Sequence, residues 1–260
     1  MDQIRVLASG SGKMGRQVGA AVHAQADMEL LGFVDAFASA DHCEGLPCLR
    51  DPELAVREFH PDVIIDFTNA AWTPPLAQAA IPAGVRLVVG TTGLSNDFLT
   101  WLGAQCATRK VGAVVAPNFA IGAVLMMHFA RQAARFFDNA EIIELHHDQK
   151  VDAPSGTAKT TAELMAAARK DPFVYPETEK ETIPGSRGAR FENLAIHSVR
   201  LPGLVAHQEV IFGGLGQTLT IRHDTTGRDS FMPGVLAATR AVVGLDHLVV
   251  GLDAMLGLAE

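Results

Sequence analysis

Short hydrophobic runs alternate with Ala-rich segments of helical spacing through the first half of the chain. The runs predict strands at residues 4–9, 28–35, 62–68, 85–92 and 112–118, and helices are expected at 14–26, 72–83 and 95–107. Several runs are apolar without alternation, which is typical of parallel strands covered on both faces. This order predicts an α/β fold whose first domain is a Rossmann-like, doubly wound parallel sheet.

The pattern changes after residue 117. It predicts a helix at 120–137, a strand at 141–147, a helix at 155–169 and an exposed loop at 171–190, then strands at 194–200, 205–214 and 218–225. Successive strands with glycine-containing connections favour a mixed or antiparallel sheet in a second, α+β domain. The apolar C-terminus is expected to pack on the first domain. We therefore predict a first domain of residues 1–117, completed by 230–260, and a second of residues 118–229.

One uncharged run, residues 111–130 between Lys110 and Arg131, is long enough to span a bilayer. Pro117 and Asn118 interrupt it, with a β-branched half before them and a helix-like half after them. We interpret the run as the last strand of the parallel sheet, a turn, and the first helix of the connection to the second domain. No membrane association is expected.

Charge and cysteine content exclude further classes of protein. The net charge is −8 and no cationic run exceeds Arg109-Lys110, so the basic patch of a nucleic-acid-binding protein is missing. The N-terminus shows no signal-peptide pattern. Three cysteines cannot all pair, and the spacing of Cys43 and Cys48 matches no zinc or redox motif. These features favour a cytoplasmic protein with reduced thiols and no metal.

A glycine-rich turn follows the first predicted strand and opens the first predicted helix. Gly10, Gly12 and Gly15 match G-x-G-x-x-G, whose glycines allow a tight turn, approach of a pyrophosphate and close packing of helix on strand. The amides of the helix N-terminus then bind phosphate. Asp35 ends the second strand, where a carboxylate accepts hydrogen bonds from ribose hydroxyls. A plain turn and a surface aspartate are the alternative, but strand, helix and acid coincide here.

The predicted cofactor is NADH, with NADPH also accepted. Asp35 repels a 2′-phosphate and Ala36 offers no arginine, whereas Lys13 in the glycine turn supplies a compensating charge. Ligands of doubly wound sheets lie at the carboxyl ends of strands, which places two further turns near the nicotinamide. The predicted cofactor-binding residues are Gly10, Ser11, Gly12, Lys13, Met14, Gly15, Asp35, Gly90, Thr91, Thr92, Ala116, Pro117, Asn118 and Phe119.

Residues 144–158 are the most informative segment of the chain. His146, His147 and Lys150 lie at a strand end, before a turn of small residues that opens a helix. The amides of that turn suit a carboxylate, and a histidine beside a lysine suits protonation of a carbanion or enamine after hydride transfer. Taken alone, the histidines are equally compatible with a structural role. A metal site of Glu144 with both histidines is disfavoured, because adjacent strand residues point to opposite faces.

The pattern E-L-H-H-x-x-K-x-D-A-P-S-G-T-A in this segment resembles the signature of the 4-hydroxy-tetrahydrodipicolinate reductase family, also called dihydrodipicolinate reductases. The resemblance covers nearly the whole chain. It includes Lys13-Met14-Gly15, Asp66-Phe67-Thr68, His207 and the segments 90–93, 116–119, 200–203, 220–223 and 228–231. It implies a mixed-sheet domain that assembles a homotetramer. The implied reaction is the NADH- or NADPH-dependent reduction of 4-hydroxy-tetrahydrodipicolinate, with loss of water, in the diaminopimelate route to lysine.

The resemblance also implies roles for individual residues. His146 would be the general acid and Lys150 a second proton donor and carboxylate ligand, while His147, Gly156 and Thr157 would contact the substrate. The chain departs from the family pattern in two places. Its glycine turn is one residue shorter than in many members, and Gln149 stands where many have a further histidine.

Two other functions stay open from the sequence. A different small-molecule dehydrogenase, such as an amino-acid dehydrogenase, explains the glycine turn but not H-H-x-x-K followed by P-S-G-T. A non-catalytic nucleotide sensor or scaffold has no need of His146 and Lys150.

Overall fold

The computed structural model describes residues 3–258, which divide into two compact units. Unit 1 contains residues 3–121 and 228–258, and unit 2 contains Gly122–Gly227. Each unit has its own sheet and its own hydrophobic core.

Unit 1 is built on a largely parallel sheet. Among the described residues it has 8 strands in the order β13-β7-β6-β5-β1-β2-β4-β3. Their bounds are β1 (Ile4–Ser9), β2 (Met28–Val34), β3 (His42–Cys43), β4 (Leu46–Leu49), β5 (Val63–Asp66), β6 (Arg86–Val89), β7 (Ala113–Val115) and β13 (Leu248–Val250). Only β3 with β4 pairs antiparallel in this part of the chain. The strand order reverses at β1, which pairs with β2 on one side and β5 on the other, so ligands are expected at the carboxyl ends of these strands.

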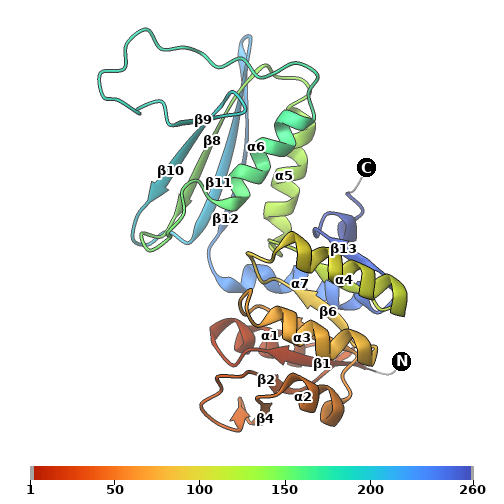
Figure 1. Cartoon of the computed structure of the whole chain (residues 1–260). Coiled ribbons are helices and arrows are strands. Elements are labelled where there is room, and N and C mark those ends of the chain that lie inside the picture. Colours follow the sequence, from red (N-terminus) through yellow and green to blue (C-terminus); the bar gives the residue numbers. More distant parts are fainter. Residues whose placement is uncertain (1–2, 259–260) are drawn as a thin grey trace. The chain divides into compact units, whose positions relative to one another are not determined.

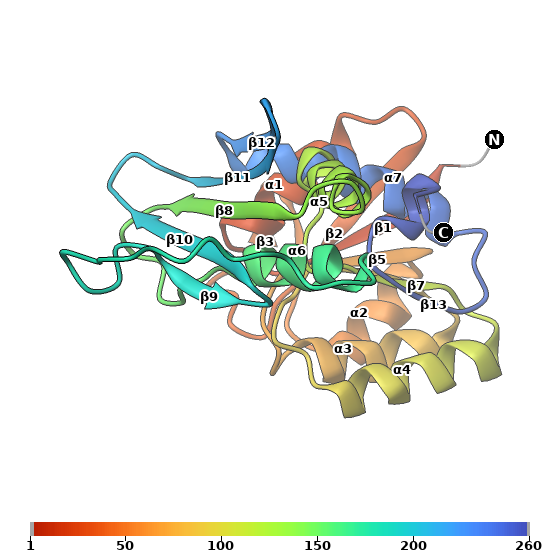
Figure 2. The same ribbon diagram turned by 90° about the horizontal axis from the view of Figure 1, so that it is seen from above.

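Helices cover both faces of this sheet (Figures 1 and 2). Those on one face are α1 (Lys13–His23) and α7 (Met232–Val242), and those on the other are α2 (Pro52–Phe59), α3 (Thr73–Ala80) and α4 (Asn96–Arg109). Short 3-10 turns occur at η1 (Ile81–Ala83), η2 (Arg228–Phe231) and η3 (Ala254–Leu256). Asp51 and Ser95 cap α2 and α4 through their side-chain oxygens, which satisfies amides of the first helical turn. Because both faces are covered, all four residues of β5 are buried.

Unit 2 has a five-stranded mixed sheet in the order β12-β11-β8-β10-β9. Its elements are α5 (Ile121–Ala133), β8 (Asn139–His146), α6 (Gly156–Ala167), β9 (Ala189–Phe191), β10 (Leu194–Arg200), β11 (Ala206–Gly214) and β12 (Gln217–Thr225). β8 and β10 are parallel, and the other pairs are antiparallel. Alanines of α5 and α6 pack with Ile142, Val210 and Phe212, so both helices cover the same face (Figure 1). The two sheets confirm the predicted fold class.

The uncharged run at 111–130 forms β7, a turn and most of α5, as the sequence predicts. In the part of the chain that the structure describes, no helix combines the length and the apolar character needed to cross a membrane. The C-terminal segment adds α7 and β13 to unit 1, where β13 pairs in parallel with β7.

Two predictions of local structure were wrong. The helix expected at 120–137 ends at Ala133, because the next amides, those of Arg135 and Phe136, donate to carbonyls three residues earlier, at 3.3 and 2.9 Å. The Arg169 guanidinium then donates to the carbonyl of Ala134 at 2.6 Å and to that of Phe137, which satisfies carbonyls beyond the helix end. The loop expected at 171–190 ends earlier, because β9 begins at Ala189 and pairs with β10.

Candidate active site

In the glycine turn after β1, one glycine has no space for a side chain and another faces open space. A Cβ on Gly15 would lie 1.8 Å from the carbonyl oxygen of Gly10, so no side chain fits where α1 meets the strand. A Cβ on Gly12 would meet nothing within 4 Å, and Gly12 is the N-cap of α1. The first amides of a helix have no partner within that helix. The turn therefore leaves room for an anionic group at this helix N-terminus, which fits the pyrophosphate of a dinucleotide.

Asp35 follows β2 and lies against the glycine turn. Its Oδ2 accepts hydrogen bonds from the Ser11 amide at 2.8 Å and the Ser11 hydroxyl at 2.6 Å, and its Oδ1 accepts from the Phe37 amide at 2.9 Å. Burial raises the pKa of Asp35, but the hydrogen bonds from Ser11 and Phe37 outweigh burial and lower the pKa overall. Asp35 is therefore a fixed, ionised acceptor beside the turn.

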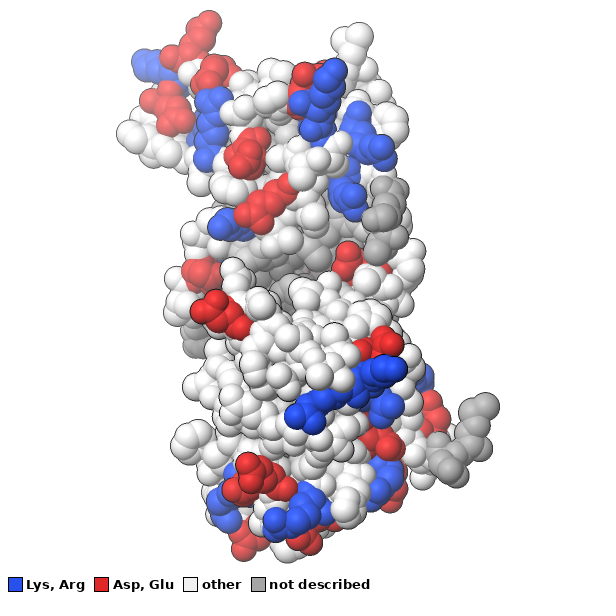
Figure 3. Space-filling view, turned by 45° about the vertical axis from the view of Figure 1, so that its right-hand side comes forward, with Lys and Arg blue, Asp and Glu red and all other residues white. Residues whose placement is uncertain are grey.

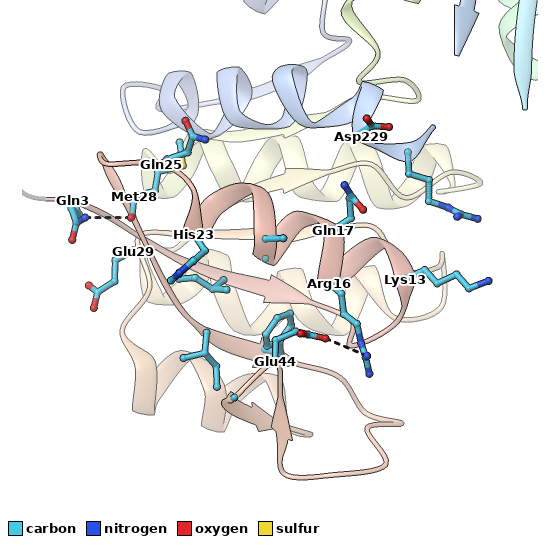
Figure 4. A pocket seen from close by; sticks show the side chains of 17 residues that line it. Gln3, Lys13, Arg16, Gln17, His23, Gln25, Met28, Glu29, Glu44 and Asp229 are labelled. Carbon is cyan, nitrogen blue, oxygen red and sulfur yellow. Dashed lines mark hydrogen bonds and ion pairs between the residues drawn. The ribbon is translucent and has the colours of Figure 1, made fainter. Parts of the chain in front are cut away.

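A cavity of about 1230 Å³ in unit 1 begins at the N-terminal end of α1 (Figure 4). Lys13, Arg16 and Gln17 line it from the helix. The Arg16 Nε donates to the Ser11 carbonyl at 2.9 Å, and its Nη1 lies 3.2 Å from Glu44 Oε1. The Lys13 and Arg16 side chains are both exposed, and Arg16 already pairs with an acidic residue.

The turns after β5 and β6 are organised by a buried carboxylate that the sequence did not mark as functional. Asp66 has no exposed surface and accepts hydrogen bonds from four hydroxyls. The donors and distances are Ser9 (2.8 Å), Thr68 (2.7 Å), Thr73 (2.5 Å) and Thr91 (3.1 Å). The Asp66 carbonyl also accepts from the Gly90 amide at 2.8 Å. Two residues of the predicted cofactor-binding set, Gly90 and Thr91, are therefore fixed by one aspartate, while Thr92 is exposed.

The turn at 116–119 lies beside the turn after β5. The Ala116 amide donates to the Val89 carbonyl at 3.0 Å, and the Phe119 ring packs against Phe67 at 5.2 Å between centroids. Asn118 Oδ1 accepts from the Ala120 amide at 2.9 Å, and Pro117 is exposed. Unit 1 thus brings the glycine turn, the 90–92 turn and the 116–119 turn together at the carboxyl ends of its parallel strands.

In unit 2, the end of β8 carries the histidine that the sequence singled out. His146 Nδ1 lies 2.5 Å from Oε2 of Glu144, which has no exposed surface. Arg200 donates to both Glu144 oxygens, at 2.8 Å from Nη1 and 2.7 Å from Nη2. Burial raises the pKa of Glu144, but hydrogen bonds from His146, Arg200 and Ser198 outweigh burial and lower it to about 2. Glu144 is therefore ionised at neutral pH.

The loop after β8 holds the other predicted residues. Lys150 Nζ pairs with Asp152 Oδ1 at 2.7 Å, and this hydrogen bond lowers the pKa of Asp152. His147 and Gly156 are exposed and Thr157 is half-buried. A Cβ on Gly156 would meet nothing within 4 Å, so the first turn of α6 is open.

His207 lies on the unit 2 sheet, on the face opposite to that of His146. It pairs across the strands with Leu145, and its Nδ1 lies 2.7 Å from Asp224 Oδ1. The Val205 amide donates to His207 Nε2 at 3.2 Å, so the neutral ring carries its proton on Nδ1.

Sequence reasoning missed the roles of Glu144 and Arg200 beside His146. The sequence suggests Glu144 only as a disfavoured metal ligand, and it shows Arg200 only as part of a family motif. The sequence does hold one clue to Glu144. Residues of β8 alternate between buried and half-buried, and Glu144 occupies an inward position after Ala140 and Ile142. A carboxylate in such a position requires buried partners.

Comparison with known proteins decides between the open alternatives. The family model described as "Dihydrodipicolinate reductase, N-terminus" matches residues 4–119, and the one described as "Dihydrodipicolinate reductase, C-terminus" matches residues 122–256. The chain belongs to the dihydrodipicolinate reductase family. The resemblance seen at residues 144–158 is thereby confirmed, and with it the prediction of an oxidoreductase that uses a nicotinamide cofactor.

Individual relatives match over almost their full length. The 4-hydroxy-tetrahydrodipicolinate reductase of Moorella thermoacetica is 50% identical, with 97% of this chain and 98% of the relative covered. That of Geobacillus thermodenitrificans is 48% identical, with 96% and 98% covered.

Among solved structures, the dipicolinate-bound dihydrodipicolinate reductase of Paenisporosarcina sp. TG-14 has a TM-score of 0.89 at 42% identity. The match covers 97% of this chain and 99% of that one. An amine dehydrogenase of Mycobacterium smegmatis has a TM-score of 0.64 at 13% identity, over 96% of this chain and 95% of that one. The second likeness shows a shared fold alone.

Proposed function

We propose that the protein reduces 4-hydroxy-tetrahydrodipicolinate to tetrahydrodipicolinate, with loss of water, in the diaminopimelate route to lysine. The observation that carries this proposal is the segment from Glu144 to Thr157. It combines an oriented histidine, a lysine and an open helix N-terminus in a member of the dihydrodipicolinate reductase family. The dipicolinate-bound relative supports a cyclic dicarboxylate as the ligand class.

The substrate is a cyclic imine that bears two carboxylates and loses its 4-hydroxyl as water. Reduced nicotinamide supplies a hydride to ring C4, and one proton completes the reduction. We assign the proton to His146, with Lys150 as a second donor and as a ligand of one carboxylate. His147 and the open turn at Gly156 and Thr157 complete the substrate contacts.

Local donors must recognise this dianion, because the protein as a whole is acidic. The net charge is −8, and the face shown in Figure 3 carries Lys and Arg side chains interspersed with Asp and Glu. No broad positive field on that face attracts an anion. Lys150 is bound to Asp152 here, so a substrate carboxylate would replace or share that partner.

The cofactor is assigned to the glycine turn, Asp35, the 90–92 turn and the 116–119 turn. The open Gly12 position favours a pyrophosphate, and the fixed Asp35 carboxylate favours unmodified ribose hydroxyls. NADH is therefore the preferred cofactor, while the exposed Lys13 allows NADPH to be used as well.

A coupled assay tests the reaction. The substrate is formed in situ from pyruvate and aspartate semialdehyde by the preceding synthase, and loss of reduced nicotinamide is followed. Consumption that depends on both precursors is expected. A folded protein that consumes none would eliminate the proposed reaction.

Two substitutions test the assigned roles. His146→Ala is expected to lower kcat with little change in KM, whereas Lys150→Ala lowers kcat and raises KM for the substrate. Near-wild-type kinetics in His146→Ala would refute its role as the acid. The cofactor preference fails if kcat/KM for NADPH equals or exceeds that for NADH.

We also assign a homotetramer to the protein, supported by the second face of the unit 2 sheet. Ile143, Leu145, Val199 and Ile211 share this face by register, and the helices of unit 2 cover the other face. All four side chains are only half-buried, as expected of a surface that a further copy covers. Light scattering is expected to give four times the chain mass of 27.6 kDa, and the mass of a single chain would exclude the assembly.

A cytoplasmic location is consistent with the state of the thiols. Cys43, Cys48 and Cys106 are free and buried, and burial raises the pKa of Cys106 to about 11. These thiols are poor nucleophiles and behave as small apolar side chains.

A further inference from the structure

In unit 2, the Glu144 carboxylate accepts hydrogen bonds from residues at the ends of β8 and β10 and at the start of α6. One of these residues is His146, the assigned proton donor. Glu144 Oε2 accepts from His146 Nδ1 at the end of β8 and from Arg200 Nη1 at the end of β10. Its Oε1 accepts from Arg200 Nη2 and, at 3.2 Å, from the amide of Ser155, the N-cap of α6. Each oxygen therefore accepts from at least two donors, as an ionised carboxylate can.

This arrangement determines which nitrogen of His146 carries the proton. An ionised carboxylate only accepts hydrogen bonds, so the 2.5 Å contact requires a proton on Nδ1. Nε2 is then the nitrogen that gains and releases a proton. The Arg200 guanidinium donates to both oxygens of Glu144. This bidentate contact favours the ionised carboxylate and balances its charge.

Arg200 extends the same network to the loop that carries Lys150. Its Nη2 donates to the Asp152 carbonyl at 2.8 Å, and Asp152 pairs through its side chain with Lys150. Both proton donors assigned to the reaction are therefore attached to the Glu144–Arg200 pair, one directly and one through Asp152.

We propose that Glu144, supported by Arg200, is a positioning residue that keeps Nδ1 of His146 protonated, so that the imidazolium delivers its Nε2 proton in the reduction and returns to the neutral, Nδ1-protonated ring. This inference rests on the proposed function for its kinetic part, but the placement of the proton does not depend on it. Glu144 itself is buried and acts through His146.

The chain contains a matched control three residues earlier on the same strand. Glu141 also binds one arginine and one histidine, with Arg187 Nη2 at 2.5 Å and His197 Nε2 at 2.8 Å. It lies on the other face of β8, away from His146 and on the face assigned to the assembly, so Glu141→Gln serves as the control once light scattering shows that this variant has the wild-type mass. Glu141→Gln therefore removes a similar set of hydrogen bonds without touching the assigned catalytic histidine.

The first measurement is ¹⁵N NMR of histidine-labelled protein, with His146→Gln used to assign the His146 signals. The ligand-free wild type is expected to show neutral His146 protonated on Nδ1. In Glu144→Gln both tautomers appear, because an amide can either accept from Nδ1–H or donate to an unprotonated Nδ1. Glu141→Gln leaves the His146 signals unchanged. A wild-type ring protonated on Nε2 would overturn the proposal.

The second measurement is steady-state kinetics with the same variants. Glu144→Gln is expected to lower kcat by roughly 30-fold, part of the usual contribution of a general acid, with KM changed less than about threefold. Glu141→Gln stays within about threefold of wild type in both constants. Equal losses of kcat in the two variants would reduce Glu144 to a structural role.

Two further outcomes are separable. If wild type consumes no reduced nicotinamide, the proposed reaction fails, and the NMR result alone decides how Glu144 orients His146. If Glu144→Gln does not fold, Glu144→Asp replaces it. The shorter side chain keeps the charge but withdraws the carboxylate by about 1.5 Å, one C–C bond. With the carboxylate withdrawn, Nδ1 loses its acceptor, so mixed tautomers and a loss of kcat are again expected, and their absence would contradict the proposal.

Discussion

Among residues 3–258, each unit buries one carboxylate completely, and the two carboxylates are held in opposite ways. Asp66 in unit 1 is surrounded by the hydroxyls of Ser9, Thr68, Thr73 and Thr91. Glu144 in unit 2 is held by the Arg200 guanidinium and the His146 ring. Neutral donors can only fix a carboxylate in place. Groups that carry or exchange a proton also couple the carboxylate to chemistry.

The positions of the two carboxylates fit this difference. The hydroxyls around Asp66 come from the ends of β1 and β6, from the turn after β5 and from the start of α3, so they tie together the turns assigned to the cofactor. Of the groups around Glu144, His146 comes from the segment assigned to the substrate, and Arg200 comes from the end of β10. A dinucleotide site needs rigid backbone at strand ends, whereas a proton donor needs a defined tautomer and a compensated charge.

We call Glu144 with Arg200 and His146 the charged set, and Asp66 with its four hydroxyl donors the neutral set. The largest expected effect is the loss of stability when the charged set is broken. Glu144→Ala leaves Arg200, whose side chain is 19% exposed, without its anion. We expect the free energy of unfolding to fall by about 4 kcal/mol, the usual range for removing one partner of a buried pair. Urea unfolding at fixed protein concentration measures the change. Replacing Arg200 by Met in the same protein should restore part of the loss, and a loss below about 1 kcal/mol would show that the pair is not buried in solution.

Much of unit 1 could be predicted from the sequence, because its structure follows from local patterns. The glycine turn, the acid at the end of β2 and the strand–helix alternation are all encoded within short segments. The sequence predicts no element at residues 36–60, which form β3, β4 and α2, because strands of two and four residues and a helix of eight are too short to show a clear periodicity.

The partners of the two carboxylates could not be predicted in this way. Arg200 is 56 residues from Glu144, and their contact follows from the parallel register of β10 on β8. Ser9 and Thr91 are likewise distant from Asp66 in sequence and meet it only because β1, β5 and β6 are neighbours. The sequence marked residues of the proposed site, but register and topology decide what holds them.

The second effect is a pH dependence of stability that belongs to Glu144. Its pKa falls from an ordinary value of 4.5 to about 2 in the folded chain, so its contribution is complete above pH 4.5 and is lost as the pH falls toward 2. The shift corresponds to about 3 kcal/mol, of which about 2 kcal/mol is lost by pH 3. Urea unfolding of wild type and Glu144→Gln between pH 7 and 3 should show the two stabilities converging. A constant difference would contradict the assignment.

The third effect breaks the neutral set. Asp66→Asn keeps the shape of the side chain but replaces one acceptor oxygen by a donor that faces hydroxyl groups. We expect a loss of about 2 kcal/mol, since the hydroxyls must reorient or lose their acceptor. Asp62→Asn is the control. Asp62 is half-buried, precedes β5 and accepts one hydrogen bond, from the Arg5 amide, so this substitution should lower the free energy of unfolding by less than about 1 kcal/mol. A loss equal to that of Glu144→Ala would remove the distinction between neutral and charged sets.

The smallest effect concerns the outer edge of the neutral set. The Trp72 indole donates from Nε1 to the Ser9 hydroxyl at 2.9 Å, and that hydroxyl donates to Asp66. Trp72→Phe removes this donor and should cost about 1 kcal/mol, the net value of one hydrogen bond. Trp101→Phe controls for the change in ring size, because Trp101 stacks on Phe98 in α4, away from Asp66. If the hydroxyls act as one cooperative set, Trp72→Phe combined with Asp66→Asn costs less than the sum of the two single changes. Strict additivity would mean that each hydroxyl contacts Asp66 independently.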